Sequence, residues 1–181
     1  DGKYVAYGIS RGGSDWKEFY VKSIETGEDL QDHIMWAKFS GVAWLNDGFF
    51  YSRYPEPVEG NELSGVNENS KVYYHKIGDA QSDDKLIYEE PENPRVGFGV
   101  SITEDQQIMT LYKTESTSGN ALSFRKVNSE GGFIDIITDF ESDFSVIDHH
   151  EGNLLVLSNY EASNYKLIAI NIDNPARQNW T

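Results

Sequence analysis

The chain has 181 residues, enough for one ordinary domain, and its hydrophobic and charged fractions of 38% and 25% are typical of a globular protein. Its 30 acidic residues against 15 basic ones give a net charge of −15, which argues against nucleic-acid binding and against docking to an anionic membrane. Without cysteine it can form no disulfide, no thiolate metal site and no cysteine nucleophile.

The chain opens on three strand-like runs rich in aromatic and β-branched residues, which we predict at residues 3–10, 19–24 and 29–36. A turn at Asp1-Gly2 precedes the first run, and the glycine-rich stretch "RGGSD" separates the first two. A start inside a strand, without Met, indicates a piece excised from a longer chain. No signal peptide is visible, so a cytoplasmic and a periplasmic location both stay open.

A second group of strands is predicted at residues 39–46, 49–54, 72–77 and 85–90. Between its second and third strands lies Pro55–Ser70, which is rich in Pro, Gly, Asn and Glu and is predicted to be a long loop. A third and a fourth group follow, and no stretch carries a helical periodicity of useful length. These strands are expected at residues 99–105, 107–113, 122–127 and 133–140, and then at 144–150, 153–160 and 167–172.

The groups repeat at a regular spacing. An acidic residue at a tight turn before an apolar strand occurs at positions 1, 47, 105 and 151, at intervals of 46, 58 and 46 residues. Units of four short antiparallel strands at about 40–50 residues are typical of propeller blades. We therefore predict an all-β fold, a β-propeller segment of roughly four blades of four antiparallel strands. The expected blades are 1–36 (truncated), 37–90, 97–140 and 143–181 (truncated).

A blade buries its faces against its neighbours, so fewer than four blades leave a face uncovered unless they close into a ring. We expect an arc of a larger propeller, and closure as a four-bladed ring is the alternative.

The stretch Gly8-Ile9-Ser10-Arg11-Gly12 matches the Gly-x-Ser-x-Gly nucleophile elbow of serine hydrolases. An elbow needs a helix after the serine, but a glycine-rich turn and another strand-like run follow here. None of the four histidines lies in a recognisable hydrolase context. We therefore interpret the motif as a blade hairpin and predict no catalytic residue in this chain.

Metal and cofactor sites are not indicated either. In "DHHEG" (Asp148–Gly152) adjacent histidines on a strand would point to opposite faces, so a polar turn is the better interpretation. The acidic run Tyr88–Pro94 lacks the spacing of a calcium loop. There is no phosphate loop and no dinucleotide fingerprint, so no cofactor is predicted. "NWT", beginning at Asn179, formally matches a glycosylation sequon.

Several stretches are more specific than the repeat. They are "DGKYVAYGISRGGSDW", "KFSGVAWLNDGFFYSRYP", "KVYYHKIGDAQSDDKLIYEEPENP" and "NYKLIAINIDNPARQNW". In this order they resemble the propeller domain of the prolyl oligopeptidase family of serine peptidases. The resemblance implies a seven-bladed propeller that caps an α/β-hydrolase domain. It also implies that the catalytic residues lie in that hydrolase domain, and that the propeller admits only short peptides, cleaved after proline.

The same resemblance implies substrate contacts. Phe39 in "KFS" matches a family aromatic that lines the pocket for residues preceding the proline. Ordinary packing at a strand start is the alternative for Phe39. A pocket methionine of some members corresponds to Gly97, with Phe98 beside it, and a further pocket position falls near Thr117; at these positions the sequence departs from the family. The Pro55–Ser70 loop matches a propeller loop linked to substrate entry.

The expected partners are therefore a hydrolase domain of the same chain and short proline-containing peptides, with no nucleic acid, no membrane and a monomeric state. A stand-alone binding or scaffold propeller without a peptidase domain is the second hypothesis.

Overall fold

The computed structural model describes residues 2–62 and 64–181; Asp1 of the first predicted turn and Leu63 of the predicted loop lie outside them. Its described residues form fourteen strands in four antiparallel sheets, with two short 3-10 helices. This confirms the predicted all-β fold and its four repeated groups of strands. The chain divides into two compact units, residues 1–99 and 100–181, and each is described by itself.

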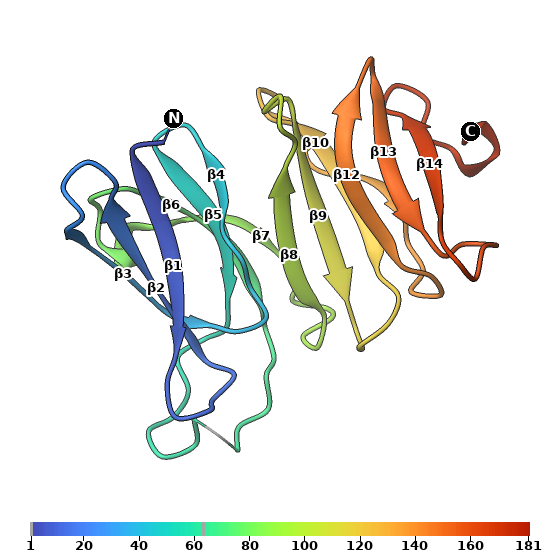
Figure 1. Cartoon of the computed structure of the whole chain (residues 1–181). Coiled ribbons are helices and arrows are strands. Elements are labelled where there is room, and N and C mark those ends of the chain that lie inside the picture. Colours follow the sequence, from blue (N-terminus) through green and yellow to red (C-terminus); the bar gives the residue numbers. More distant parts are fainter. Residues whose placement is uncertain (1, 63) are drawn as a thin grey trace. The chain divides into compact units, whose positions relative to one another are not determined.

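The first sheet of unit 1 has three strands in the order β1-β2-β3 (Figure 1). They are β1 (Tyr4–Ser10), β2 (Lys17–Ser23) and β3 (Asp29–Ala37). β1 and β2 pair residue for residue from Tyr4 opposite Ser23 to Ser10 opposite Lys17. Their connection contains Gly12 and Gly13 at φ values of 61° and 75°, a left-handed backbone that glycine adopts at little cost. The Gly-x-Ser-x-Gly motif is thus part of a β-hairpin, as predicted.

The second sheet of unit 1 has four strands in the order β4-β5-β6-β7. They are β4 (Ala43–Leu45), β5 (Gly48–Arg53), β6 (Lys71–Lys76) and β7 (Lys85–Glu89), with the 3-10 helix η1 (Gln81–Asp83) before β7. The predicted strand 39–46 is shorter than expected. Phe39 has a φ of 54°, which does not fit a strand, and the Ser40 hydroxyl accepts the N–H of Ser52 at 2.9 Å in place of a backbone partner.

Unit 1 encloses a core between its two sheets. The buried side chains are Phe19, Val21, Ile34, Ala37, Phe49 and Tyr51. They come from β2 and β3 on one side and from β5 on the other. On β2 and β5 they occupy alternate positions, which point to the same face, whereas on β3 a bulge adds one residue between Ile34 and Ala37. Burying each large apolar side chain contributes about 1.5–3 kcal/mol, so this contact attaches the first sheet to the second.

The third sheet, in the order β11-β10-β9-β8, and the fourth, in the order β12-β13-β14, follow the same plan. The boundary between the units falls within β8 (Gly97–Ile102). Their own core includes Leu122, Phe124, Phe144, Leu154 and Ile170. The remaining elements are β9 (Ile108–Thr114), β10 (Ala121–Lys126), β11 (Ile134–Ile137), β12 (Phe144–His150), β13 (Asn153–Ser158), β14 (Lys166–Asn171) and η2 (Arg177–Asn179).

Where a fourth strand would complete the last sheet, the chain instead forms η2 and returns to the edge of β14. Thr181 and Ala169 exchange two backbone hydrogen bonds, at 2.7 and 3.1 Å. Among residues 2–62 and 64–181, no helix has the length and apolar character needed to cross a membrane.

Candidate functional site: an exposed phenylalanine on an aromatic base

Phe39 lies on the turn that connects β3 to β4, with 75% of its surface exposed. Within this chain the ring is neither in a strand nor covered, so packing against the described residues does not account for its position. Its left-handed backbone costs a residue with a side chain about 1–2 kcal/mol. A large apolar ring held in strain and presented to solvent is a feature that packing does not explain, and such outliers concentrate at binding sites.

A β-bulge at the end of β3 sets the course of this turn. Lys17 pairs with Ala37 and Phe19 with Ile34, so two residues of β3 face one of β2. The second of these, Trp36, has a φ of 61°. Bulges of this kind bend a strand and redirect its side chains. Here β3 pairs with β2 again at Ala37, its last residue, two positions before Phe39.

Four side chains from three segments form the base of the site. The indole of Trp16 meets Trp36 edge to face, with ring centroids 5.7 Å apart, and meets Tyr54 at 6.2 Å. The ammonium of Lys38 lies 5.1 Å from the Trp16 ring and 5.5 Å from the Phe39 ring. These are favourable cation–π and edge-to-face geometries, and Lys38 connects the Phe39 ring to the aromatic cluster around Trp16.

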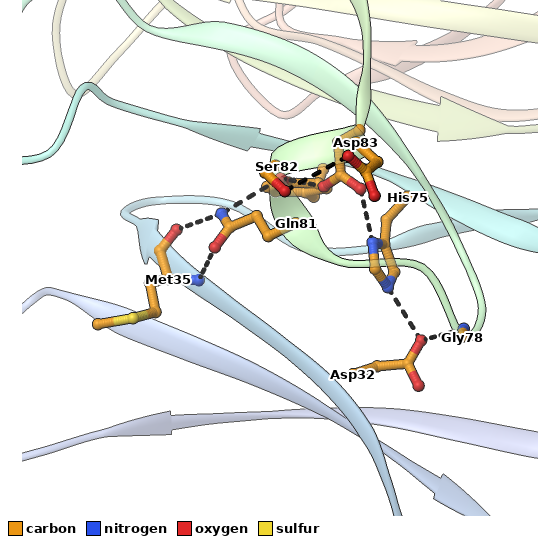
Figure 2. A network of polar contacts seen from close by, with 9 residues as sticks. Asp32, Met35, His75, Gly78, Gln81, Ser82 and Asp83 are labelled. Carbon is orange, nitrogen blue, oxygen red and sulfur yellow. Dashed lines mark hydrogen bonds and ion pairs between the residues drawn. The ribbon is translucent and has the colours of Figure 1, made fainter.

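The backbone of Met35, in the bulge, is hydrogen-bonded by a side chain of the 3-10 helix η1. The amide of Gln81 accepts the N–H of Met35 and donates to its C=O, both at 3.0 Å. Gln81 therefore substitutes for a strand partner at the bulge (Figure 2).

A buried charged network lies beside this contact (Figure 2). His75 on β6 is completely buried, and its Nδ1 lies 2.7 Å from Asp84 and its Nε2 2.9 Å from Asp32 on β3. Both carboxylates are 1% exposed. Asp32 also accepts the N–H of Gly78, and Asp84 accepts the hydroxyl of Tyr51 at 2.6 Å.

With both carboxylates ionised, this geometry favours the charged imidazolium. A neutral imidazole has one N–H, whereas the imidazolium has two and can donate to both carboxylates at once. Burial by itself lowers the pKa of His75, but the hydrogen bonds and charges of Asp84 and Asp32 outweigh it and raise that pKa above its ordinary value. Burial and the hydrogen bond to Asp84 also raise the pKa of Tyr51, so its hydroxyl remains a donor. The network joins β3 of the first sheet to β6 and its following turn in the second.

Ser10 has none of the surroundings of a nucleophile. It is the exposed last residue of β1, and a turn and β2 follow it. Each histidine has a carboxylate partner instead: His33 pairs with Glu18, His75 with Asp32 and Asp84, His149 with Asp105, and His150 with Glu151.

The adjacent histidines of "DHHEG" differ in burial, with side chains 7% and 72% exposed for His149 and His150. They face opposite sides of β12, as predicted. In the described part of the chain no three His, Asp or Glu side chains are grouped as metal ligands.

The other predicted contact positions lie on other elements of the chain. Phe98 is buried, packs edge to face against Tyr88 at 5.1 Å, and its C=O accepts the Ser52 hydroxyl. Gly97, beside it on β8, is half-buried. Thr117 is exposed in the connection between β9 and β10 of unit 2. A peptide-contacting role for these three positions stays a prediction.

The chain matches, over residues 1–181, the family described as prolyl oligopeptidase, N-terminal beta-propeller domain. It belongs to this family. The prolyl endopeptidase of Elizabethkingia meningoseptica is 39% identical over 180 residues, and prolyl oligopeptidase A of Amanita bisporigera is 33% identical over 198. These alignments cover 99% and 96% of the chain and 26% of each relative, so the chain spans about a quarter of their length.

Solved structures agree. A prolyl endopeptidase structure covers 97% of this prolyl oligopeptidase propeller chain, with a TM-score of 0.86 and 30% identity; the match spans 25% of that protein. Prolyl oligopeptidase B of Galerina marginata, bound to a 35-residue hydrolysis and macrocyclization substrate, also has a TM-score of 0.86, at 27% identity. That match covers 96% of the chain and 26% of the solved protein.

In this prolyl oligopeptidase propeller, sequence reasoning selected Phe39 but missed Trp16, Trp36 and Lys38 around it. "GSDW" and "KFS" could be read as family motifs, yet nothing in their spacing shows that they meet. The network of His75 was missed as well, since its partners lie 43 residues before it and nine after it.

Proposed function

We propose that this chain is the non-catalytic, substrate-gating part of a prolyl oligopeptidase-type serine endopeptidase, an enzyme that cleaves short peptides after proline. Family membership supports the enzyme class. The hairpin around Ser10, in which a turn and a strand replace the helix of a nucleophile elbow, supports placing the catalytic residues elsewhere. The propeller would then act by steric selection, admitting short peptides and keeping water from the reacting bond.

The observation that carries the proposal is the presentation of Phe39. Its ring is 75% exposed, contacts the ammonium of Lys38, which also covers Trp16, and is held in a strained backbone. An apolar wall of this kind suits the side chain of a peptide residue that precedes the proline. Gly97, Phe98 and Thr117 belong to the same proposal as weaker candidates, because the sequence departs from the family there.

The proposal extends to the organisation of the protein. We propose blades at residues 1–36, 37–90, 97–140 and 143–181, further blades beyond them, and an α/β-hydrolase domain as the intramolecular partner. The complete open reading frame tests this directly. A flanking hydrolase region with its own Gly-x-Ser-x-Gly motif is expected, and a reading frame that closes a propeller and ends would instead favour a stand-alone binding protein.

Kinetics test the role of Phe39. In the full-length protein, Phe39→Ala should raise KM for peptides with a bulky apolar residue before the proline, and should change peptides with glycine there much less. Loss of the ring costs little folding energy because it is exposed. Equal kcat/KM across the peptide series for Phe39→Ala and the wild type would refute the role.

A further inference from the structure

Trp16 makes contacts in two directions. Its ring meets Trp36 and lies under the ammonium of Lys38, which also covers Phe39. Its indole Nε1 donates to the C=O of Glu62, at 2.5 Å. Glu62 belongs to the loop Pro55–Ser70, so a residue of the β1–β2 hairpin touches both this loop and the turn that presents Phe39.

Trp16 is itself held in place. Its backbone N–H donates to the Ser14 hydroxyl at 3.1 Å, and the neighbouring Asp15 pairs with Lys38 at 3.7 Å. The ring is half-buried, so its contacts are partly shielded from water and the indole N–H has a defined direction.

The tip of the loop has its own turn structure. The C=O of Asn61 accepts the N–H groups of Ser64 and Gly65, and the carboxylate of Glu62 accepts the N–H of Gly60. A tip organised by local turns can move as a body. The bond from Trp16 to Glu62 joins this body to the sheet, whereas Val58 and Val66 remain more than 70% exposed.

We propose that Trp16 is a positioning residue that couples the loop Pro55–Ser70 to the Phe39 turn, so that the position of the loop and the presentation of Phe39 change together. The claim that Trp16 holds the loop rests on the contacts described above. The effect on substrates rests on the proposed function of Phe39. When the loop leaves Trp16, the ring loses its orientation and the base under Phe39 loosens; when the loop returns, both are restored.

Limited proteolysis of the full-length protein tests the first part. Trp16→Phe keeps an aromatic ring but removes the N–H that binds Glu62. A glutamate-specific protease should then cut within the loop, at Glu59 or Glu62, about three- to tenfold faster, as loss of one hydrogen bond implies.

The matched control is Trp180→Phe. Trp180 is also half-buried, and its Nε1 also donates to a backbone oxygen, that of Pro175, at 2.9 Å, but it lies in unit 2. It should leave cutting within the loop unchanged. Loop cutting at the wild-type rate in Trp16→Phe would overturn the proposal, and so would an equal acceleration in Trp180→Phe.

Peptide kinetics test the second part. Trp16→Phe should raise KM for peptides with a bulky apolar residue before the proline while kcat stays within about twofold, and combining it with Phe39→Ala should add no further loss. Faster loop cutting with unchanged KM, while Phe39→Ala does raise KM, would refute the coupling and leave the function of Phe39 intact. No change of KM in Phe39→Ala would refute that function, and the proteolysis result would still decide the loop part.

Discussion

Replacing His75 with glutamine removes the cation between two buried carboxylates. The imidazolium donates to Asp84 at 2.7 Å and to Asp32 at 2.9 Å, and none of the three groups reaches solvent appreciably. Glutamine can donate to one carboxylate but brings no charge. The other carboxylate stays buried with only a neutral donor, the Gly78 N–H for Asp32 or the Tyr51 hydroxyl for Asp84, and removal of one partner from a buried ion pair costs about 3–5 kcal/mol. We expect the free energy of unfolding to fall by about this amount.

The raised pKa of His75 also predicts how the free energy of unfolding changes with pH. Because the pKa of His75 is raised in the folded chain, its stabilisation is complete below the unfolded pKa of about 6.5 and is lost as pH rises through the folded pKa. Over that interval the folded state binds one more proton than the unfolded state. The free energy of unfolding therefore falls by about 1.4 kcal/mol per pH unit. This component of the slope should be missing in His75→Gln.

Urea unfolding of the purified chain between pH 6 and pH 9, followed by circular dichroism, measures both effects. His33→Gln is the matched control, since His33 also contacts a carboxylate, Glu18 at 2.8 Å, but its side chain is 40% exposed. An exposed pair of this kind contributes about 0–1 kcal/mol. A loss in His75→Gln no larger than in His33→Gln, or an identical pH slope in His75→Gln and the wild type, would refute the reasoning.

Three further changes test the site and its support by the same unfolding measurement. Phe39→Gly should give a free energy of unfolding about 1 kcal/mol higher than Phe39→Ala, because glycine alone relieves the left-handed strain; equal values would show that the turn is unstrained. Gln81→Ala should lose about 1–3 kcal/mol, since the N–H and C=O of Met35 lose their partners, and an unchanged midpoint would contradict that role. Gly48→Ala should lose at least about 2 kcal/mol, because its Cβ would lie 2.0 Å from a backbone oxygen of the neighbouring strand. Gly132→Ala is its control, because nothing lies within 4 Å of the Cβ there; similar losses in the two variants would refute the clash argument.

The local sequence pattern predicts most of the fold. Alternating aromatic and β-branched runs predicted the strands, because a strand with one covered face needs apolar side chains at every second position. The repeated acidic turns predicted four units. The glycines after Ser10 predicted a hairpin where a motif search alone suggests a nucleophile, since the surroundings of the serine, and not its motif, decide its chemistry.

Only the tertiary structure decided the features that carry function. Phe39 is exposed and has a left-handed backbone just after a β3 bulge that contains Trp36, and Gln81, 46 residues after Met35, binds the backbone of that bulge. The charge of His75 depends likewise on two carboxylates brought in from other strands and turns. Such contacts depend on which strands become neighbours. The burial of whole sheet faces determines which strands become neighbours, and the short-range periodicity of a sequence does not show it.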